Sequence, residues 1–175
     1  MLVVNILFIL FFAVRLFSLK ISIQNEKRLI EKQAVQYGKR NSILLSMAHI
    51  AFYFSAIYEA NSSAYSFDGI TIVGFVILSL AYLALFWVIK ALGEIWTVKL
   101  YILPEHKINT AFLFQTIRHP NYFLNIIPEL IGLGMMCHAW HTLTFIFPAY
   151  LVILGVRIYQ EETVMKTLFA QARGK

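Results

Sequence analysis

The chain has 175 residues, of which 59% are hydrophobic and only 14% are charged, and its formal net charge is +6. Soluble domains are roughly 45–50% apolar and about 25% charged, so this composition excludes a water-soluble globular protein. A single cysteine, Cys137, excludes an intramolecular disulfide and a zinc site built from several thiolates, and we expect no metal site. Residues 1–175 contain no Pro- or Gly-rich tract, so we expect a single membrane-embedded domain.

Uncharged runs long enough to cross a bilayer indicate where the helices lie. A hydrocarbon core about 30 Å thick needs roughly 20 apolar residues per helix. Five runs near this length predict an all-α integral membrane protein with about five transmembrane helices. They are Leu2–Leu19, Ser42–Ala60, Ile70–Ile89, His119–Cys137 and Thr142–Val156. Because only four residues, 138–141, connect the last two runs, we expect these to form a tight antiparallel hairpin.

The first run is expected to be a retained membrane anchor, because it is long and lacks both a preceding basic segment and a cleavage site. Arg15 interrupts it, and we expect this side chain to reach the lipid headgroups from near the end of the span. In the later runs, His49, Tyr53 and Glu59 could line a cavity, although an isolated histidine in a membrane helix more often satisfies a neighbouring backbone group. For Glu129, a structural hydrogen bond or a partner histidine is favoured over catalysis, because an unpaired carboxylate in hydrocarbon is costly.

The distribution of lysine and arginine predicts the orientation. Residues 20–41 hold six of them, residues 90–118 hold four and the tail from residue 157 holds four, whereas residues 61–69 and 138–141 hold none. The positive-inside rule therefore places the N-terminus outside and the C-terminus in the cytoplasm. Attraction of the cytoplasmic loops to anionic lipid accounts for the positive charge, and we expect no nucleic-acid partner.

Polar residues gather at the cytoplasmic ends of the last three runs. Residues 91–118 are too long for a simple turn, and with the tail they predict a cytoplasmic layer in which chemistry would take place. Residues 157–170 predict a short C-terminal interfacial helix, on which Arg157 and Glu161 lie four residues apart on one face. At the start of the fourth run, Pro120 favours helix initiation, and His119 and Tyr122 lie three residues apart.

Four motifs in the second half of the chain occur in a characteristic order. They are Leu92-Gly93-x-x-Trp96, His106, Arg118-His119-Pro120-x-Tyr122 and Arg157-x-x-x-Glu161-Glu162. Together they resemble the isoprenylcysteine carboxyl methyltransferase family of integral-membrane enzymes, which use S-adenosylmethionine and are related to phospholipid N-methyltransferases. The first half, with Asn25-Glu26-Lys27 and Ala34-x-x-Tyr37-Gly38, resembles the bacterial branch that includes O-methyltransferases of alkylpyrones and related phenolic lipids.

This resemblance implies that S-adenosylmethionine is the cofactor. By motif, the expected cofactor-binding residues are His106, Lys107, Ile108, Asn109, Phe114, His119, Pro120, Asn121, Tyr122 and Glu161. Phe114 stands where many relatives have a tyrosine, so a role that needs a hydroxyl is not expected there. The family's arginine at the Arg157 position faces the acceptor, which makes Arg157 the expected catalytic residue. The alternative is that Arg157 merely pairs with Glu161.

The expected reaction moves a methyl group from S-adenosylmethionine to an acidic oxygen of a lipophilic acceptor. An arginine stabilises an enolate, phenolate or carboxylate anion, whereas a lipid amine has little use for it. Alkylpyrone or alkylresorcinol-type lipids are the first choice by resemblance. Isoprenylcysteine carboxyl methylation and phospholipid N-methylation are the enzymatic alternatives, and a membrane assembly subunit is the non-enzymatic one. The expected partners are this acceptor and membrane lipid, and the expected location is a bacterial cell membrane.

Overall fold

The computed structural model describes residues 1–63, 67–102 and 119–173, and for residues 167–173 it describes the backbone only. Within these ranges the chain is helical apart from one pair of short strands and the connecting turns. Four helices of the described residues are long and apolar enough to cross a membrane: Leu2–Glu31, Lys39–Ser62, Gly69–Ile95 and Thr142–Lys166. The predicted all-α integral membrane fold is thereby confirmed.

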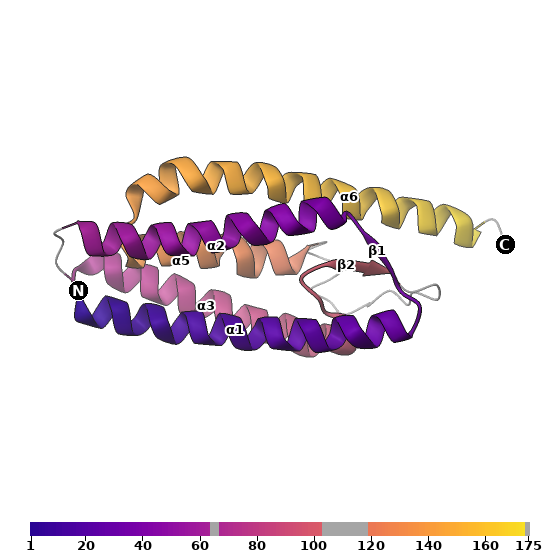
Figure 1. The fold of residues 1–175 in the computed structure, drawn as a ribbon, viewed down its shortest axis with the longest axis horizontal. Helices are drawn as coiled ribbons and strands as arrows, with labels where there is room; N and C mark the ends of the chain where they lie inside the picture. Colours follow the sequence, from indigo (N-terminus) through magenta and orange to yellow (C-terminus); the bar gives the residue numbers. More distant parts are fainter. Residues whose placement is uncertain (64–66, 103–118, 174–175) are drawn as a thin grey trace.

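The long helices lie roughly parallel to one axis (Figure 1). Helices α1 (Leu2–Glu31), α2 (Lys39–Ser62) and α3 (Gly69–Leu92) alternate in direction, and α6 (Phe147–Arg173) packs along α2. The N-terminus lies at one end of the bundle and the C-terminus at the other, as expected for an odd number of passes (Figure 1).

Helix α1 is much longer than the uncharged run predicted, since it continues past Leu19 to Glu31. Its charged last third is held by contacts with the segment that follows α3. Asn25 donates hydrogen bonds from Nδ2 to the carbonyl oxygens of Gly93 (3.0 Å) and Trp96 (2.9 Å). Arg28 forms an ion pair with Glu94 at the same place. Polar side chains therefore extend this helix beyond its apolar part.

The fourth expected span, residues 119–137, is shorter than the other membrane helices. It consists of the six-residue π-helix η2 (Asn121–Ile126) and the ten-residue helix α5 (Ile127–Met136). Helix α5 packs mainly against α3. At Gly132, an added Cβ would lie 2.6 Å from the backbone nitrogen of Leu78, and at Gly74 it would overlap the backbone of Met136. The lack of side chains at these two glycines allows the helices to touch backbone to backbone.

The connection between α5 and the last helix is tight and the two helices run in opposite directions, as expected, but they contact each other chiefly near this connection (Figure 1). Helix α5 packs mainly on α3, whereas α6 packs mainly on α2. The turn itself is anchored to α2, since Glu59 accepts hydrogen bonds from the backbone nitrogens of His141 (2.8 Å) and Thr142 (3.0 Å). Both nitrogens belong to the start of the π-helix η3 (Thr142–Ile146), where free N–H groups need acceptors.

The expected short interfacial helix at residues 157–170 is also not a separate element. Helix η3 leads directly into α6, which continues without a break to Arg173. Pro148 falls in the first turn of α6, where proline is tolerated, and residues 156–173 contain neither proline nor glycine. The last membrane span and the polar tail are therefore one helix.

The two strands tie together distant parts of the chain at one end of the bundle (Figure 1). Strand β1 (Val35–Tyr37) pairs antiparallel with β2 (Leu100–Ile102), and Gln36 lies opposite Tyr101. Between the 3₁₀-helix η1 (Gly93–Ile95) and β2, the backbone nitrogen of Val98 donates to Ser22 Oγ of α1 at 2.9 Å. These contacts place Trp96 and Val98 next to the start of α2.

Candidate functional site

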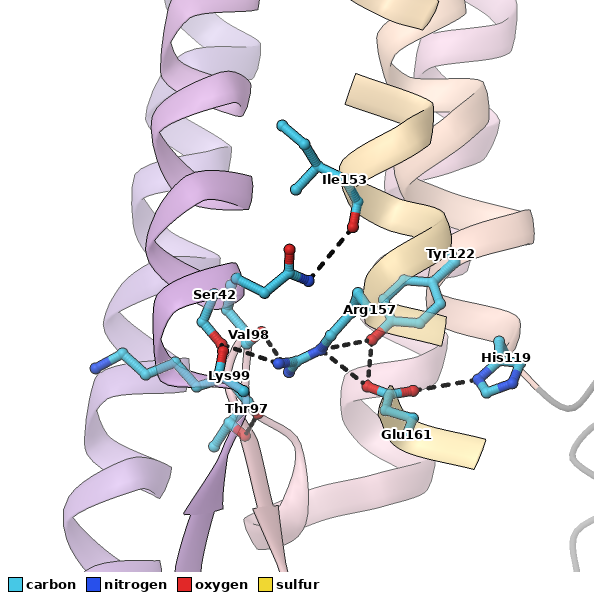
Figure 2. Close-up of polar contacts among 11 residues, drawn as sticks. Ser42, Thr97, Val98, Lys99, His119, Tyr122, Ile153, Arg157 and Glu161 are labelled. Carbon is cyan, nitrogen blue, oxygen red and sulfur yellow. Dashed lines mark hydrogen bonds and ion pairs between the residues drawn. The ribbon is translucent and has the colours of Figure 1, made fainter. Parts of the chain in front are cut away.

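A polar cluster forms near the strands, where η2, α6, the start of α2 and the segment before β2 meet (Figure 2). At its centre is Glu161 of α6, whose side chain is 19% exposed. The Tyr122 hydroxyl donates a short hydrogen bond to Glu161 Oε1. His119 Nδ1 lies 3.2 Å from Oε2 of the same carboxylate. Both oxygens of Glu161 are thus engaged while the carboxylate stays partly accessible.

Arg157 lies one helical turn before Glu161 and is almost completely buried, with 1% of its side chain exposed. Its Nε donates to Glu161 Oε1 at 3.2 Å and to the Tyr122 hydroxyl at 3.3 Å. Its Nη1 donates to Ser42 Oγ at 2.9 Å, and its Nη2 donates to the Val98 carbonyl at 3.4 Å (Figure 2). Every nitrogen of the guanidinium therefore has an oxygen partner within the protein. This arrangement favours the ion pair with Glu161 over direct contact with an acceptor.

A glycine forms the turn before α2, facing the end of the Gln160 side chain of α6. Gly38 adopts φ +60°, in the left-handed region that favours glycine, and precedes the first turn of α2. A Cβ at this position would overlap Gln160 Oε1 and lie 3.7 Å from Arg157 Nη1. The Gly38 carbonyl accepts hydrogen bonds from the backbone nitrogen and the hydroxyl of Ser42. The turn at Gly38 thus positions Ser42 for its contact with Arg157.

The positions of His119 and Tyr122 follow from the way η2 begins. Pro120 fits the first turn, and the backbone nitrogen of Tyr122 donates to the His119 carbonyl at 3.1 Å. The two rings are stacked, with their centroids 5.7 Å apart, so both side chains reach Glu161 from one side. The hydrogen bond with Glu161 raises the pKa of His119 above its usual value, and Glu162, 3.6 Å away, adds to the effect. A protonated His119 is therefore favoured beside these carboxylates.

A cavity of about 250 Å³ lies beside this cluster, with its wall formed largely by α1 and α2. Tyr122 and Val98, which both contact Arg157, are part of the wall. Most of the other lining residues are apolar. Four of them are also exposed on the outer surface of the bundle, where a membrane protein faces lipid: Leu16, Leu19, Ile50 and Phe54. The cavity thus connects the polar cluster to the lipid-facing surface.

A second polar cluster lies in the interior of the bundle around Glu129, whose side chain is completely buried. Tyr53 and Tyr82 donate hydrogen bonds to its Oε1 at 2.6 and 3.3 Å. Arg15 Nη1 lies 3.3 Å from Oε2, and His49 Nε2 lies 3.4 Å from Oε1. The contacts expected for Glu129, a structural hydrogen bond and a partner histidine, are confirmed.

Two expectations about this cluster are wrong. Arg15 does not reach toward the headgroups but pairs with Glu129, because α1 continues to Glu31 and so leaves Arg15 near the middle of the helix. Among the described residues, His49 contacts side chains rather than a backbone group, and it lines the cavity, as the alternative interpretation of the sequence had it. Its ring nitrogens face Glu129 and, at 3.3 Å, the hydroxyl of Tyr150.

Comparison with known proteins identifies the family. Residues 72–167, more than half of the chain, match the sequence model of the isoprenylcysteine carboxyl methyltransferase family. The chain belongs to this family. An uncharacterized protein of Haemophilus influenzae is 58% identical over 172 residues, which cover 98% of this chain and 100% of the relative. The uncharacterized protein YpbQ of Bacillus subtilis is 26% identical over 147 residues, 82% of this chain and 84% of the relative. No solved structure matches this chain.

Membership of the isoprenylcysteine carboxyl methyltransferase family makes this chain an integral-membrane methyltransferase. Of the expected cofactor-binding residues, the structure brings His119, Tyr122 and Glu161 into contact. Pro120 is buried beside them, and Asn121 lines the cavity. Five expected residues lie outside the described part of the chain: His106, Lys107, Ile108, Asn109 and Phe114.

Three residues of the cluster were not among the expected site residues, although Gly38 belongs to one of the motifs that carry the resemblance. Ser42 and Val98 contact Arg157, and Gly38 faces a side chain of α6. The glycine after Tyr37 is a signal for a left-handed turn, and Ser42 is a polar residue at the start of an apolar run. The contact of Val98 involves only its backbone carbonyl, so its side chain carries no signal of this role.

Proposed function

We propose that this chain transfers a methyl group from S-adenosylmethionine to an acidic oxygen of a lipophilic acceptor, with alkylpyrone or alkylresorcinol-type lipids as the first choice. The observation that carries the proposal is the contact between a largely apolar cavity and the Glu161 cluster through Tyr122. An amphipathic acceptor needs such a meeting point between a lipid-facing space and a polar one. We further propose that the polar cluster faces the cytoplasm, where the cofactor is available.

Glu161 has the chemistry needed to hold the cofactor. Its carboxylate is partly exposed, and Oε2 contacts His119 within the described residues. A carboxylate oxygen has two lone pairs, so Oε2 retains room for a hydroxyl or ammonium donor. His119, with its raised pKa, offers positive charge for a carboxylate group. When bound, S-adenosylmethionine supplies an electrophilic methyl group on a positively charged sulfonium.

Tyr122 is the group best placed to meet the acceptor, because it lines the cavity and touches both Glu161 and Arg157. The Arg157 guanidinium beside it is paired with Glu161, so Arg157 serves as a positioning residue that orients Tyr122 and Glu161. The choice of an oxygen acid over a lipid amine as the acceptor rests on the resemblance to the bacterial branch of the family.

Water exclusion is the second contribution of the chain. Methyl transfer to an oxygen anion would form a carbon–oxygen bond as the carbon–sulfur bond of the cofactor breaks, and a neutral thioether would leave. Both charges would disappear in this step, so a dry meeting point favours the transfer. Trp96 and Tyr122, which line this end of the cavity, are 2% and 7% exposed. These buried rings keep the proposed site dry.

The proposal is tested first by cofactor binding. S-adenosylhomocysteine should stabilise the purified protein against thermal unfolding, and Glu161→Gln should weaken its binding about tenfold or more, as expected for loss of a hydrogen bond to a charged group. Isothermal titration calorimetry in detergent gives the affinities directly.

Glu162→Gln is the matched control, because Glu162 neighbours Glu161 but is 36% exposed and contacts His119 only at 3.6 Å. It should bind S-adenosylhomocysteine almost as tightly as the unmodified protein. Equal losses in both variants, or no binding by the unmodified protein, would refute the assigned site. Methyl transfer from labelled S-adenosylmethionine to an alkylresorcinol then tests the acceptor class.

A further inference from the structure

The cavity has a second polar wall, formed by residues of the Glu129 cluster. Arg15, His49 and Tyr150 all line it. His49 lies seven residues beyond Ser42 on α2, and Tyr150 lies seven residues before Arg157 on α6, which at 1.5 Å per residue is about 10 Å along each helix. The same cavity therefore touches Tyr122 at one level of the bundle and Arg15 about two helical turns away.

Arg15 is incompletely satisfied by the protein. Among the described residues its guanidinium forms the ion pair with Glu129 but no hydrogen bond of good geometry. Its side chain is 16% exposed, whereas Glu129 behind it is completely buried and does not line the cavity. A guanidinium carries five N–H donors, and leaving them unpaired inside a membrane protein is costly. Oxygen atoms of a bound molecule would relieve this cost.

We infer that Arg15 binds a second oxygen of the acceptor head, at the opposite end from the oxygen presented beside Tyr122. This inference rests on the proposed function and narrows its substrate class. The cavity volume of about 250 Å³ is slightly below the usual range for small-molecule sites, roughly 300–1,000 Å³, so it suits a compact head rather than a whole lipid. The apolar chain of the acceptor would leave between α1 and α2, past Leu16 and Ile50.

This two-point arrangement selects among acidic oxygen acceptors. A ring with oxygens at two separate positions, as in alkylresorcinols and alkylpyrones, reaches both Tyr122 and Arg15. A carboxylate at the end of a prenylated cysteine has its two oxygens at a single point, so this group offers no second, separate oxygen to Arg15, which keeps only its ion pair with Glu129. Arg15 is thus assigned as a specificity-determining residue for ring acceptors with two oxygens.

A pair of matched lipids tests the assignment. An alkylresorcinol and an alkylphenol with the same pentadecyl chain differ by one hydroxyl group. Their dissociation constants are measured on the full chain in nanodiscs, with and without S-adenosylhomocysteine, by quenching of tryptophan fluorescence, since Trp96 lines the cavity. The unmodified protein should bind the resorcinol about tenfold more tightly, as expected for one hydrogen bond to a charged group.

Variants distinguish binding of the second acceptor oxygen by Arg15 from a purely structural role of this residue. In the double variant Arg15→Met/Glu129→Gln, which avoids leaving a carboxylate unpaired, the preference should fall to about twofold or less. Glu129→Gln alone retains Arg15 and should keep the full preference. Arg15→Lys should keep part of it, because lysine retains the charge but not the planar fork.

The outcomes distinguish the role of Arg15 from the proposed function. Equal binding of both lipids, or equal loss of preference in Glu129→Gln and the double variant, would overturn the role of Arg15 alone. Binding of neither lipid would overturn both the role of Arg15 and the proposed acceptor class. Failure to bind S-adenosylhomocysteine and to transfer methyl groups would instead overturn the proposed function, because lipid preference is measured by binding and does not depend on turnover.

Discussion

Arg157 Nε and Glu161 Oε1 lie 3.2 Å apart across one turn of α6, and the Tyr122 hydroxyl contacts both side chains. The residue expected to meet the acceptor and the residue expected to meet the cofactor are therefore physically coupled. A change in either one will alter the position of the other.

We expect Arg157→Ala to weaken binding of S-adenosylhomocysteine and to slow single turnover by comparable factors, about tenfold or more. The reason is that Glu161 and Tyr122 both lose the cation that orients them. Calorimetric titration and rapid-quench kinetics on the same variant give the two losses. If turnover collapses while cofactor affinity is unchanged, Arg157 contacts the acceptor directly, as the family resemblance first implied.

Stability should depend on pH through His119. The hydrogen bond with Glu161 raises the pKa of His119 in the folded protein. The contribution of protonated His119 to the free energy of unfolding is therefore complete at pH values below the ordinary histidine pKa, about 6.5. It is lost as the pH rises through the higher folded-state pKa. We therefore expect Tm to fall by a few degrees between about pH 6 and pH 8. The Tm of His119→Gln should not show this fall between about pH 6 and pH 8. If the Tm of the variant depends on pH as that of the unmodified protein does, His119 is not the source of the pH dependence.

The close backbone contact between α3 and α5 should make the protein sensitive to larger side chains at this interface. A Cβ at Gly132 would lie 2.6 Å from the backbone nitrogen of Leu78, so Gly132→Ala must push the helices apart. We expect a loss of about 1–3 kcal/mol in the free energy of unfolding, typical of overpacking. Gly155→Ala is the matched control, because nothing lies within 4 Å of a Cβ at that position of α6. Unfolding in detergent should separate the two variants, and equal stability would contradict the close packing.

The proposed orientation of the chain in the membrane can be tested by cysteine labelling. A cysteine replacing Ser63, at the end of α2, should react with an impermeant maleimide added to intact cells, whereas a cysteine replacing Glu31, at the end of α1, should react only after lysis. Both positions are exposed, and the native Cys137 is buried and can be replaced by alanine as background. The reverse pattern would place the Glu161 cluster outside the cell and remove the cofactor from its reach.

Hydropathy alone located the membrane helices but not their ends. The apolar run of α1 stops at Leu19, yet the helix continues to Glu31 because Asn25 and Arg28 find partners in the segment after α3. Such partners are distant in sequence, so no local sequence pattern predicts these contacts. The same limitation explains why Arg15 was expected near the headgroups. The three-residue strands β1 and β2 are likewise too short to be recognised from alternation.

At the candidate site, the sequence motifs pointed to His119, Tyr122 and Glu161, which the structure brings into contact, because residue types at fixed spacing are visible in the chain itself. They did not reveal that Ser42 and the Val98 carbonyl would occupy the Arg157 guanidinium. A backbone carbonyl carries no residue-specific signal, and Ser42 lies 115 positions from Arg157. The cost of an unpaired carboxylate predicted a histidine partner for Glu129. It did not predict the ion pair between Glu129 and Arg15.

The continuity of α6 links the surrounding lipid to Glu161, the proposed cofactor-binding carboxylate. A single helix runs from Phe147 within the apolar bundle to Arg173 in the polar tail, and Glu161 is fixed on it, whereas His119 and Tyr122 belong to a different part of the chain. Long apolar helices tilt when the hydrocarbon layer becomes thinner. The acyl-chain length of the host membrane should therefore change the position of Glu161 relative to His119 and Tyr122. This enzyme should be assayed in bilayers of defined thickness.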